Sequence, residues 1–157
     1  MMHPYLLTFL WSATPILELR ASIPLGYLRF GLSIYEATLI SIVGNIVSAA
    51  IVLALIPVIV NFFEKYIPVF DRIMKRLFAH TRTKHSHKMA VIGEIMLILF
   101  VGIPLPGTGA WTGMLIAYLF GIRYWKSIFL VGTGVVISGI IVALVTLFGR
   151  EMWNLIF

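Results

Sequence analysis

Two stretches of the chain contain no charged residue and are long enough to cross a membrane as helices. Residues 37–63 form an uncharged run of 27 residues, and residues 127–149 form one of 23 residues. A helix that spans the hydrocarbon core of a bilayer needs about 20 mainly apolar residues at a rise of roughly 1.5 Å each. The pattern therefore predicts two membrane-spanning helices, one in each half of the chain.

A shorter, interrupted apolar stretch precedes each of these runs. The first, residues 6–17, ends at Glu18 and is followed by an Ile-Pro-Leu-Gly sequence. The second begins at Met89, breaks at 102–109 and resumes at 110–120. Two prolines and three glycines within the eight residues of that break cannot continue a regular helix. Each stretch is therefore expected to form two half-helices.

Irregular backbone survives at membrane depth only where it is buried in protein or lines a polar cavity. We therefore predict two re-entrant helical hairpins, with the turn of the first at 18–26 and the turn of the second at 104–109. The alternative is a pair of ordinary spanning helices, each kinked at its prolines.

The two halves also repeat the same order of elements. When residues 31–52 are shifted by 90 positions, Gly44 pairs with Gly134 and Ser48 with Ser138. Each half would cross the bilayer once, so the second half would be inverted relative to the first, a plan that recurs among secondary transporters. The expected fold is a single all-α integral membrane domain built as an inverted repeat of a re-entrant hairpin plus a transmembrane helix. Its parts are a first repeat (1–63), a basic amphipathic linker (64–88) and a second repeat (89–157).

Composition supports a membrane protein. The chain is 61% hydrophobic and 11% charged, with a mean hydropathy of +1.03, whereas soluble domains average about 25% charged residues. The net charge of +6 is concentrated in the linker between hydrophobic runs, which points to the cytoplasmic membrane surface and not to nucleic acid. We therefore expect a multi-pass protein of the cell membrane with a cytoplasmic linker and both termini outside.

Catalytic and metal-binding chemistry finds little support in the sequence. The chain has no cysteine, so a disulfide, a thiolate nucleophile and a thiolate metal ligand are all excluded. No histidine lies in a hydrophobic segment, and the linker histidines lack an acidic partner at ligand spacing. We expect no enzyme activity, no cofactor and no metal site.

Glu18 and Arg20 are the most informative residues because ionisable groups at membrane depth normally mark a transport pathway or an ion pair. The planar guanidinium of Arg20 suits an anionic group such as phosphate, and Glu18 could carry a coupling proton. A purely structural Glu–Arg pair is the alternative, as are two side chains that reach for the membrane surface.

Further polar or irregular positions complete the candidate substrate path. Backbone groups freed by the break at 104–109 could approach an anion, although close helix packing would also explain its glycines. Asn45 could instead bond between helices, and Glu94 could reach the cytoplasmic interface. The candidates are Glu18, Arg20, Ser22, Pro24, Asn45, Glu94, Pro104, Pro106, Gly107, Thr108, Gly109 and Thr112.

Three sequences together resemble a known family. They are Glu-Leu-Arg-Ala-Ser-Ile-Pro-Leu-Gly at 18–26, Gly-Asn at 44–45, and Pro-Leu-Pro-Gly-Thr-Gly-Ala-Trp-Thr-Gly at 104–113. They are similar to the small multidrug export protein family, within the wider DedA-like (VTT/SNARE-associated) membrane superfamily. The resemblance implies an inverted-repeat fold with two re-entrant hairpins, and relatives that move lipids, notably polyprenyl phosphates.

The resemblance to DedA proteins is incomplete. Glu18 resembles the acidic residue of their first hairpin. DedA proteins also carry arginines beside the second break, whereas this chain has no arginine between Lys88 and Arg123. Arg20 would have to take that role.

The sequence thus favours a transporter or a flippase- or scramblase-like lipid translocase. Its substrate would be an amphipathic anion such as a polyprenyl phosphate or a phospholipid, with a proton as a coupling ion. So few helices cannot enclose a path alone, so a homo-oligomer such as a dimer is expected, with membrane lipids as its other partners. The alternatives are a proton-coupled exporter of cationic drugs, which Arg20 disfavours by charge repulsion, and a non-transporting membrane scaffold.

Overall fold

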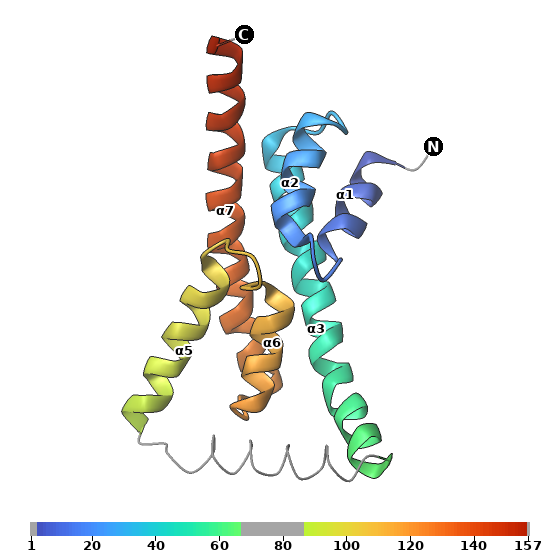
Figure 1. Cartoon of the computed structure of the whole chain (residues 1–157), viewed down its shortest axis with the longest axis vertical. Coiled ribbons are helices and arrows are strands. Elements are labelled where there is room, and N and C mark those ends of the chain that lie inside the picture. The colour runs from blue at the N-terminus through green and yellow to red at the C-terminus, as the bar shows by residue number, and fades with distance from the viewer. Residues whose placement is uncertain (1–2, 67–86, 157) are drawn as a thin grey trace.

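The computed structural model describes residues 3–66 and 87–156, which form helices joined by short turns and contain no β-strand (Figure 1). The helices in this part of the chain are α1 (Pro4–Ser12), α2 (Glu18–Leu28), α3 (Ile34–Tyr66), α5 (His87–Gly102), α6 (Ala110–Leu119) and α7 (Tyr124–Ile156). The predicted amphipathic linker falls largely outside the described residues.

Two long helices, α3 and α7, form the frame of the molecule. Each contains 33 residues, and each is longer at both ends than the uncharged run from which it was predicted. The spans Ile34–Phe63 and Tyr124–Glu151 are long and apolar enough to cross a membrane. The two helices pack closely because small residues face the partner: a Cβ on Gly139 would lie 2.9 Å from the side chain of Ile42.

A short helical hairpin lies beside each end of this frame. The hairpin α1–α2 packs on α3, and the hairpin α5–α6 packs on α7 at the opposite end (Figure 1). The turns at 13–17 and 103–109 both lie near mid-length of the long helices. Both termini of the described chain lie at one end of the molecule, and the end of α3 and the start of α5 lie at the other.

The first turn differs from the prediction, which placed it at 18–26. The structure turns at 13–17, and Glu18 already begins α2. Pro15 causes the break, because proline cannot donate the next helical hydrogen bond and disfavours helical backbone at the preceding residue. Pro24 lies inside α2, where its missing N–H leaves only the carbonyl of Arg20 without a helical partner.

The second break was predicted correctly. Helix α5 ends at Gly102, the segment 103–109 is irregular, and Ala110 begins α6. Proline and glycine leave this segment without the regular bonds of a helix, and short bonds such as Leu105 N–H to the carbonyl of Ile103, at 2.8 Å, replace them.

Equivalent local structure recurs at a spacing of 90 residues. Helix α3 begins at Ile34 and α7 begins at Tyr124. Shortly before each start, a glycine adopts a left-handed conformation, with φ of +74° at Gly31 and +69° at Gly121. Glycine is favoured there because it enters this region without the steric penalty of a Cβ. The two hairpins are thus joined to their long helices in the same way.

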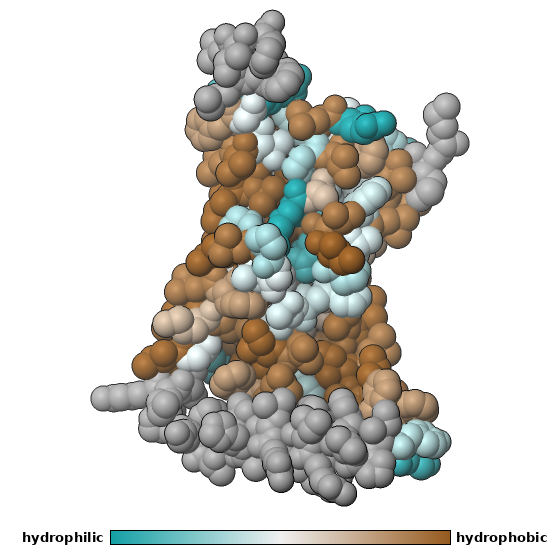
Figure 2. All heavy atoms as spheres, in the orientation of Figure 1, coloured by the Kyte–Doolittle hydropathy of each residue, from teal (hydrophilic) through white to brown (hydrophobic). Residues whose placement is uncertain are grey.

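The outer surface of the long helices is strongly apolar. On the face in Figure 2, hydrophobic side chains cover much of both halves of the molecule, and a narrower strip of hydrophilic and neutral residues runs from the upper part into the middle. Contiguous apolar surface of this extent marks contact with lipid or with another protein. Together with the two long apolar helices it indicates a membrane location. Large hydrophobic residues exposed along α3 are Leu39, Val43, Val47, Ile51, Leu55, Val58, Ile59 and Phe62, and along α7 Phe129, Val136, Ile140, Leu144, Val145 and Phe148.

Candidate functional site

The start of α2 meets the turn of the second hairpin in the middle of the molecule, through Arg20 and Thr108. Arg20 Nη2 donates a hydrogen bond of 3.1 Å to Thr108 Oγ1. The Thr108 hydroxyl shares its proton between the carbonyls of Ile103, at 2.7 Å, and Leu105, at 2.8 Å, and accepts the N–H of Leu105 at 3.2 Å. A hydroxyl has one proton and two lone pairs, so these bonds and the bond from Arg20 use all of them. Thr108 thereby shapes the second turn and ties it to the first hairpin.

The carboxylate of Glu18 lies at the N-terminus of α6. Glu18 is 5% exposed, its Oε1 accepts a long hydrogen bond of 3.5 Å from the N–H of Trp111, and the N–H of Ala110 faces the same group. The first N–H groups of a helix have no partner within the helix and favour negative charge. Gly109, the N-cap residue, offers no side chain to fill this role. Glu18 therefore caps α6 from the other hairpin.

Backbone geometry at both residues fits this close contact. A Cβ on Gly109 would overlap the carboxylate of Glu18, so only glycine leaves room for it. Glu18 itself adopts φ of +48°, a left-handed conformation that is unfavourable for residues with a side chain. Strained backbone of this kind persists only where the surrounding structure enforces it, and it clusters at functional sites.

Unpartnered polar atoms gather around the same junction. Asn45 of α3 is completely buried and its amide faces the Glu18 carboxylate, but within the described part of the chain neither its nitrogen nor its oxygen reaches a partner with standard hydrogen-bond geometry. Among the same described residues, Arg20 Nε and the indole Nε1 of Trp111, whose main-chain N–H contacts Glu18, are also buried without a partner. Native proteins leave few buried polar groups unsatisfied, so these atoms require an explanation.

A surface pocket of about 490 Å³ opens beside the junction, and Arg20 forms part of its wall. Its other lining residues come from both turns and from α2: Pro15, Ile16, Leu17, Ala21, Pro106 and Gly107. Gly107 has φ of +87°, while a Cβ there would meet nothing within 4 Å. Its glycine is thus explained by backbone conformation and not, as at Gly109, by a close neighbour.

The junction therefore unites five of the predicted site residues and places two more at its pocket. The five are Glu18, Arg20, Asn45, Thr108 and Gly109, and the two at the pocket are Pro106 and Gly107. Pro104 lies half-buried in the second turn, and Thr112 lies half-buried on α6.

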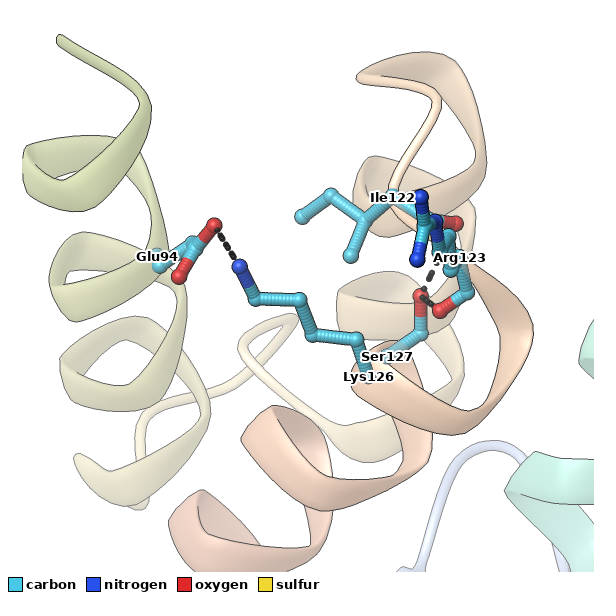
Figure 3. Close-up of polar contacts among 5 residues, drawn as sticks. All are labelled: Glu94, Ile122, Arg123, Lys126 and Ser127. Carbon is cyan, nitrogen blue, oxygen red and sulfur yellow. Dashed lines mark hydrogen bonds and ion pairs between the residues drawn. The ribbon is translucent and has the colours of Figure 1, made fainter. Parts of the chain in front are cut away.

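Other predicted residues have different surroundings. Ser22 is completely buried and donates a hydrogen bond of 2.7 Å to Ser41 of α3, away from the second turn. Pro24 lies within α2. Glu94 of α5 forms an ion pair with Lys126 at the start of α7 (Figure 3). These three residues do not belong to the junction.

Sequence reasoning missed Ser41 and Trp111. Ser41 precedes Asn45 by four residues, so the two share one face of α3, and that spacing could have identified it. Trp111 has no comparable local signal, because its role depends on its main-chain N–H at the start of α6.

One protein family matches the part of the chain that contains this junction. A family model described as "Putative small multi-drug export protein" matches residues 18–141, a range that begins at Glu18, contains both sides of the junction and extends into α7. No curated protein and no solved structure matches the chain. Because the match covers most of the sequence, the chain belongs to the small multi-drug export protein family.

Proposed function

We propose that the protein is a membrane transporter that moves an amphipathic anion, such as a polyprenyl phosphate or a phospholipid, past the junction of its two hairpins. The observation that carries this proposal is the set of buried polar atoms of Arg20, Asn45 and Trp111 that make no hydrogen bond of standard geometry within residues 3–66 and 87–156. An unsatisfied polar group in apolar surroundings costs several kcal/mol, so a ligand that bonds to these atoms would be stabilised there.

Charge favours an anion at this place. Among the described residues, the charged side chains other than Glu18 and Arg20 lie toward one or the other end of the molecule. Helices α2 and α6 both begin at the junction, and helix N-termini carry partial positive charge. One guanidinium and two helix N-termini face one carboxylate, so the junction is more attractive to a phosphate than to a cation.

Glu18 provides a mechanism for coupling. Its carboxylate occupies the amides of α6 that a substrate anion would also use. When Glu18 takes up a proton it loses its negative charge, and those amides become available to the substrate. Binding of the anion would then be accompanied by uptake of a proton, which makes the proton the coupling ion.

The repeated local structure supports an inverted repeat with two re-entrant hairpins. A Cβ on Gly44 would overlap Ser12 of α1, and a Cβ on Gly134 would lie 2.9 Å from the carbonyl of Ile98 in α5. Glycines 90 residues apart thus admit the first helix of the corresponding hairpin. The same proposal includes membership of the chain in the wider DedA-like superfamily.

The positive-inside rule sets the proposed orientation. Arg123 and Lys126 lie at the end of the molecule where α3 ends and α5 begins, and the sequence between those two helices is basic, so we propose that this end faces the cytoplasm and both termini lie outside. The proposal further includes a homo-oligomer, and it assigns the protein no catalytic residue and no cofactor.

Purified protein in liposomes tests the substrate class. We expect a fluorescent phosphate lipid to cross protein-containing membranes faster than protein-free ones, while a lipophilic cation does not. Faster movement of the cation alone would instead favour the proton-coupled drug exporter that the family description suggests, with Glu18 as its binding group. If neither compound moves, the non-transporting scaffold becomes the better account.

A further inference from the structure

A second cavity lies between α5 and the pair α6–α7, at the end of the molecule where α7 begins. Its volume is about 880 Å³, within the usual range of about 300–1,000 Å³ for ligand sites. Its walls are mainly apolar, and their central residues are Leu97, Phe100, Ile103, Ile116 and Phe120. We call this cavity the α5–α7 groove.

Charged side chains lie at one end of the groove. Glu94, Arg123 and Lys126 all line it, and Lys126 Nζ forms an ion pair with Glu94 across the gap between α5 and α7 (Figure 3). The side chain of Lys126 is 50% exposed, so it remains accessible to a second partner. Two cationic side chains and one carboxylate line this end of the groove, which leaves it with an excess of positive charge.

We propose that the α5–α7 groove binds an anionic phospholipid, with an acyl chain along the apolar wall and the phosphate at Arg123 and Lys126. A guanidinium matches the geometry of phosphate oxygens, and basic pockets between helices on the cytoplasmic side suit acidic lipid head groups. The groove is open to its surroundings, because Met96 and Leu99 on its α5 side are 60% and 49% exposed. A lipid could therefore enter sideways from the bilayer.

Charge argues against the other occupants that an apolar groove could have. A second copy of the chain would bring its own Arg123 and Lys126 to the same membrane surface. The linker of this chain is basic, with Arg72, Lys75, Arg76, Arg82 and Lys84 against Asp71 between residues 67 and 86. Either occupant would place positive charge beside positive charge, whereas an anionic head group neutralises it.

The binding inference stands apart from the transport proposal, because it concerns a different cavity and is tested without transport. Native mass spectrometry of the full chain in neutral detergent compares phosphatidylglycerol with phosphatidylcholine of identical chains. We expect tighter retention of phosphatidylglycerol. A double variant with Arg123→Gln and Lys126→Gln should weaken its binding by roughly fivefold for each charge removed and leave phosphatidylcholine unchanged. Lys65→Gln, which removes an exposed lysine at the end of α3 outside the groove, is the matched control and should bind as the wild type does.

A second variant tests the apolar wall. Ile116→Trp adds a larger side chain to the groove, so it should reduce binding of phosphatidylglycerol while Arg123 and Lys126 remain. Circular dichroism and size-exclusion profiles like those of the wild type would show that the variants fold. Equal binding of the two lipids to the wild type, or wild-type binding by the folded double variant, would overturn the proposal. So would cross-linking between copies through a cysteine at Met96 that added phosphatidylglycerol fails to reduce.

Discussion

The carboxylate of Glu18 lies directly against the backbone of Gly109, although the two residues belong to different hairpins. This contact brings a negatively charged group to the free N–H groups of α6 and joins the two halves of the molecule at mid-length.

The Gly109 contact leaves no room for a side chain. Gly109→Ala should therefore displace the Glu18 carboxylate and destabilise the protein by about 1–3 kcal/mol, the usual effect of overpacking. Thermal unfolding in detergent measures this change. Gly93→Ala is the control, since a Cβ there meets nothing within 4 Å. It should leave stability unchanged or raise it by up to about 1 kcal/mol, because alanine favours a helix more than glycine does. Equal stability of the two variants would contradict the close contact.

The hydroxyl of Thr108 should matter more than its methyl group. Thr108→Ser keeps the bonds to Arg20, Ile103 and Leu105, whereas Thr108→Val removes them. We expect the valine variant to lose about 1–3 kcal/mol of stability, because polar groups of the turn lose their partners, and to transport more slowly. The serine variant should stay close to the wild type in both measurements. If valine is tolerated as well as serine, Thr108 does not organise the turn.

Ser22 should cross-link to α3 and not to the second turn. The chain has no cysteine, so any disulfide that forms must join the two cysteines that were introduced. Cysteines at Ser22 and Ser41, whose hydroxyl oxygens are 2.7 Å apart, should form a disulfide under mild oxidation. A pair at Ser22 and Thr108 should stay reduced. Formation of the second disulfide and not the first, seen by gel mobility, would show that α2 is rotated relative to this structure.

The transport rate should stop depending on pH when residue 18 can no longer bind and release a proton. Glu18→Gln keeps the size of the side chain and an oxygen that can accept the N–H of Trp111. We therefore expect transport that no longer changes with pH, measured in liposomes over several pH values. Glu94→Gln removes a carboxylate outside the junction and should retain the pH dependence of the wild type. A pH profile that survives Glu18→Gln would assign proton coupling to another group.

Much of the fold could be predicted because a long apolar helix is visible in the sequence as a long uncharged run. The uncharged runs identified α3 and α7, and the density of proline and glycine identified the break at 102–109. The first turn was misplaced because Pro24 looks locally as disruptive as Pro15. Only the folded structure reveals that α2 continues through Pro24 at the loss of one helical bond.

The candidate site was predictable in its residues and not in its contacts. Glu18 and Arg20 attract attention because charge is rare in apolar stretches. That Glu18 reaches the N-terminus of α6, and that Ser22 turns toward Ser41, are relationships between distant segments. Local periodicity carries no information about which helices lie side by side, so these contacts could not be predicted from the sequence pattern.

Arg20 provides the most direct test of anion transport at the junction. Arg20→Ala and its control Arg29→Ala, which removes an exposed arginine at the C-terminal end of α2, are compared with the wild type in liposomes that contain a fluorescent phosphate lipid. All three proteins must show the same helical content and elution volume before reconstitution. The account predicts that Arg20→Ala abolishes protein-dependent lipid movement while Arg29→Ala retains it. Wild-type movement by correctly folded Arg20→Ala protein would contradict an anion path through this junction.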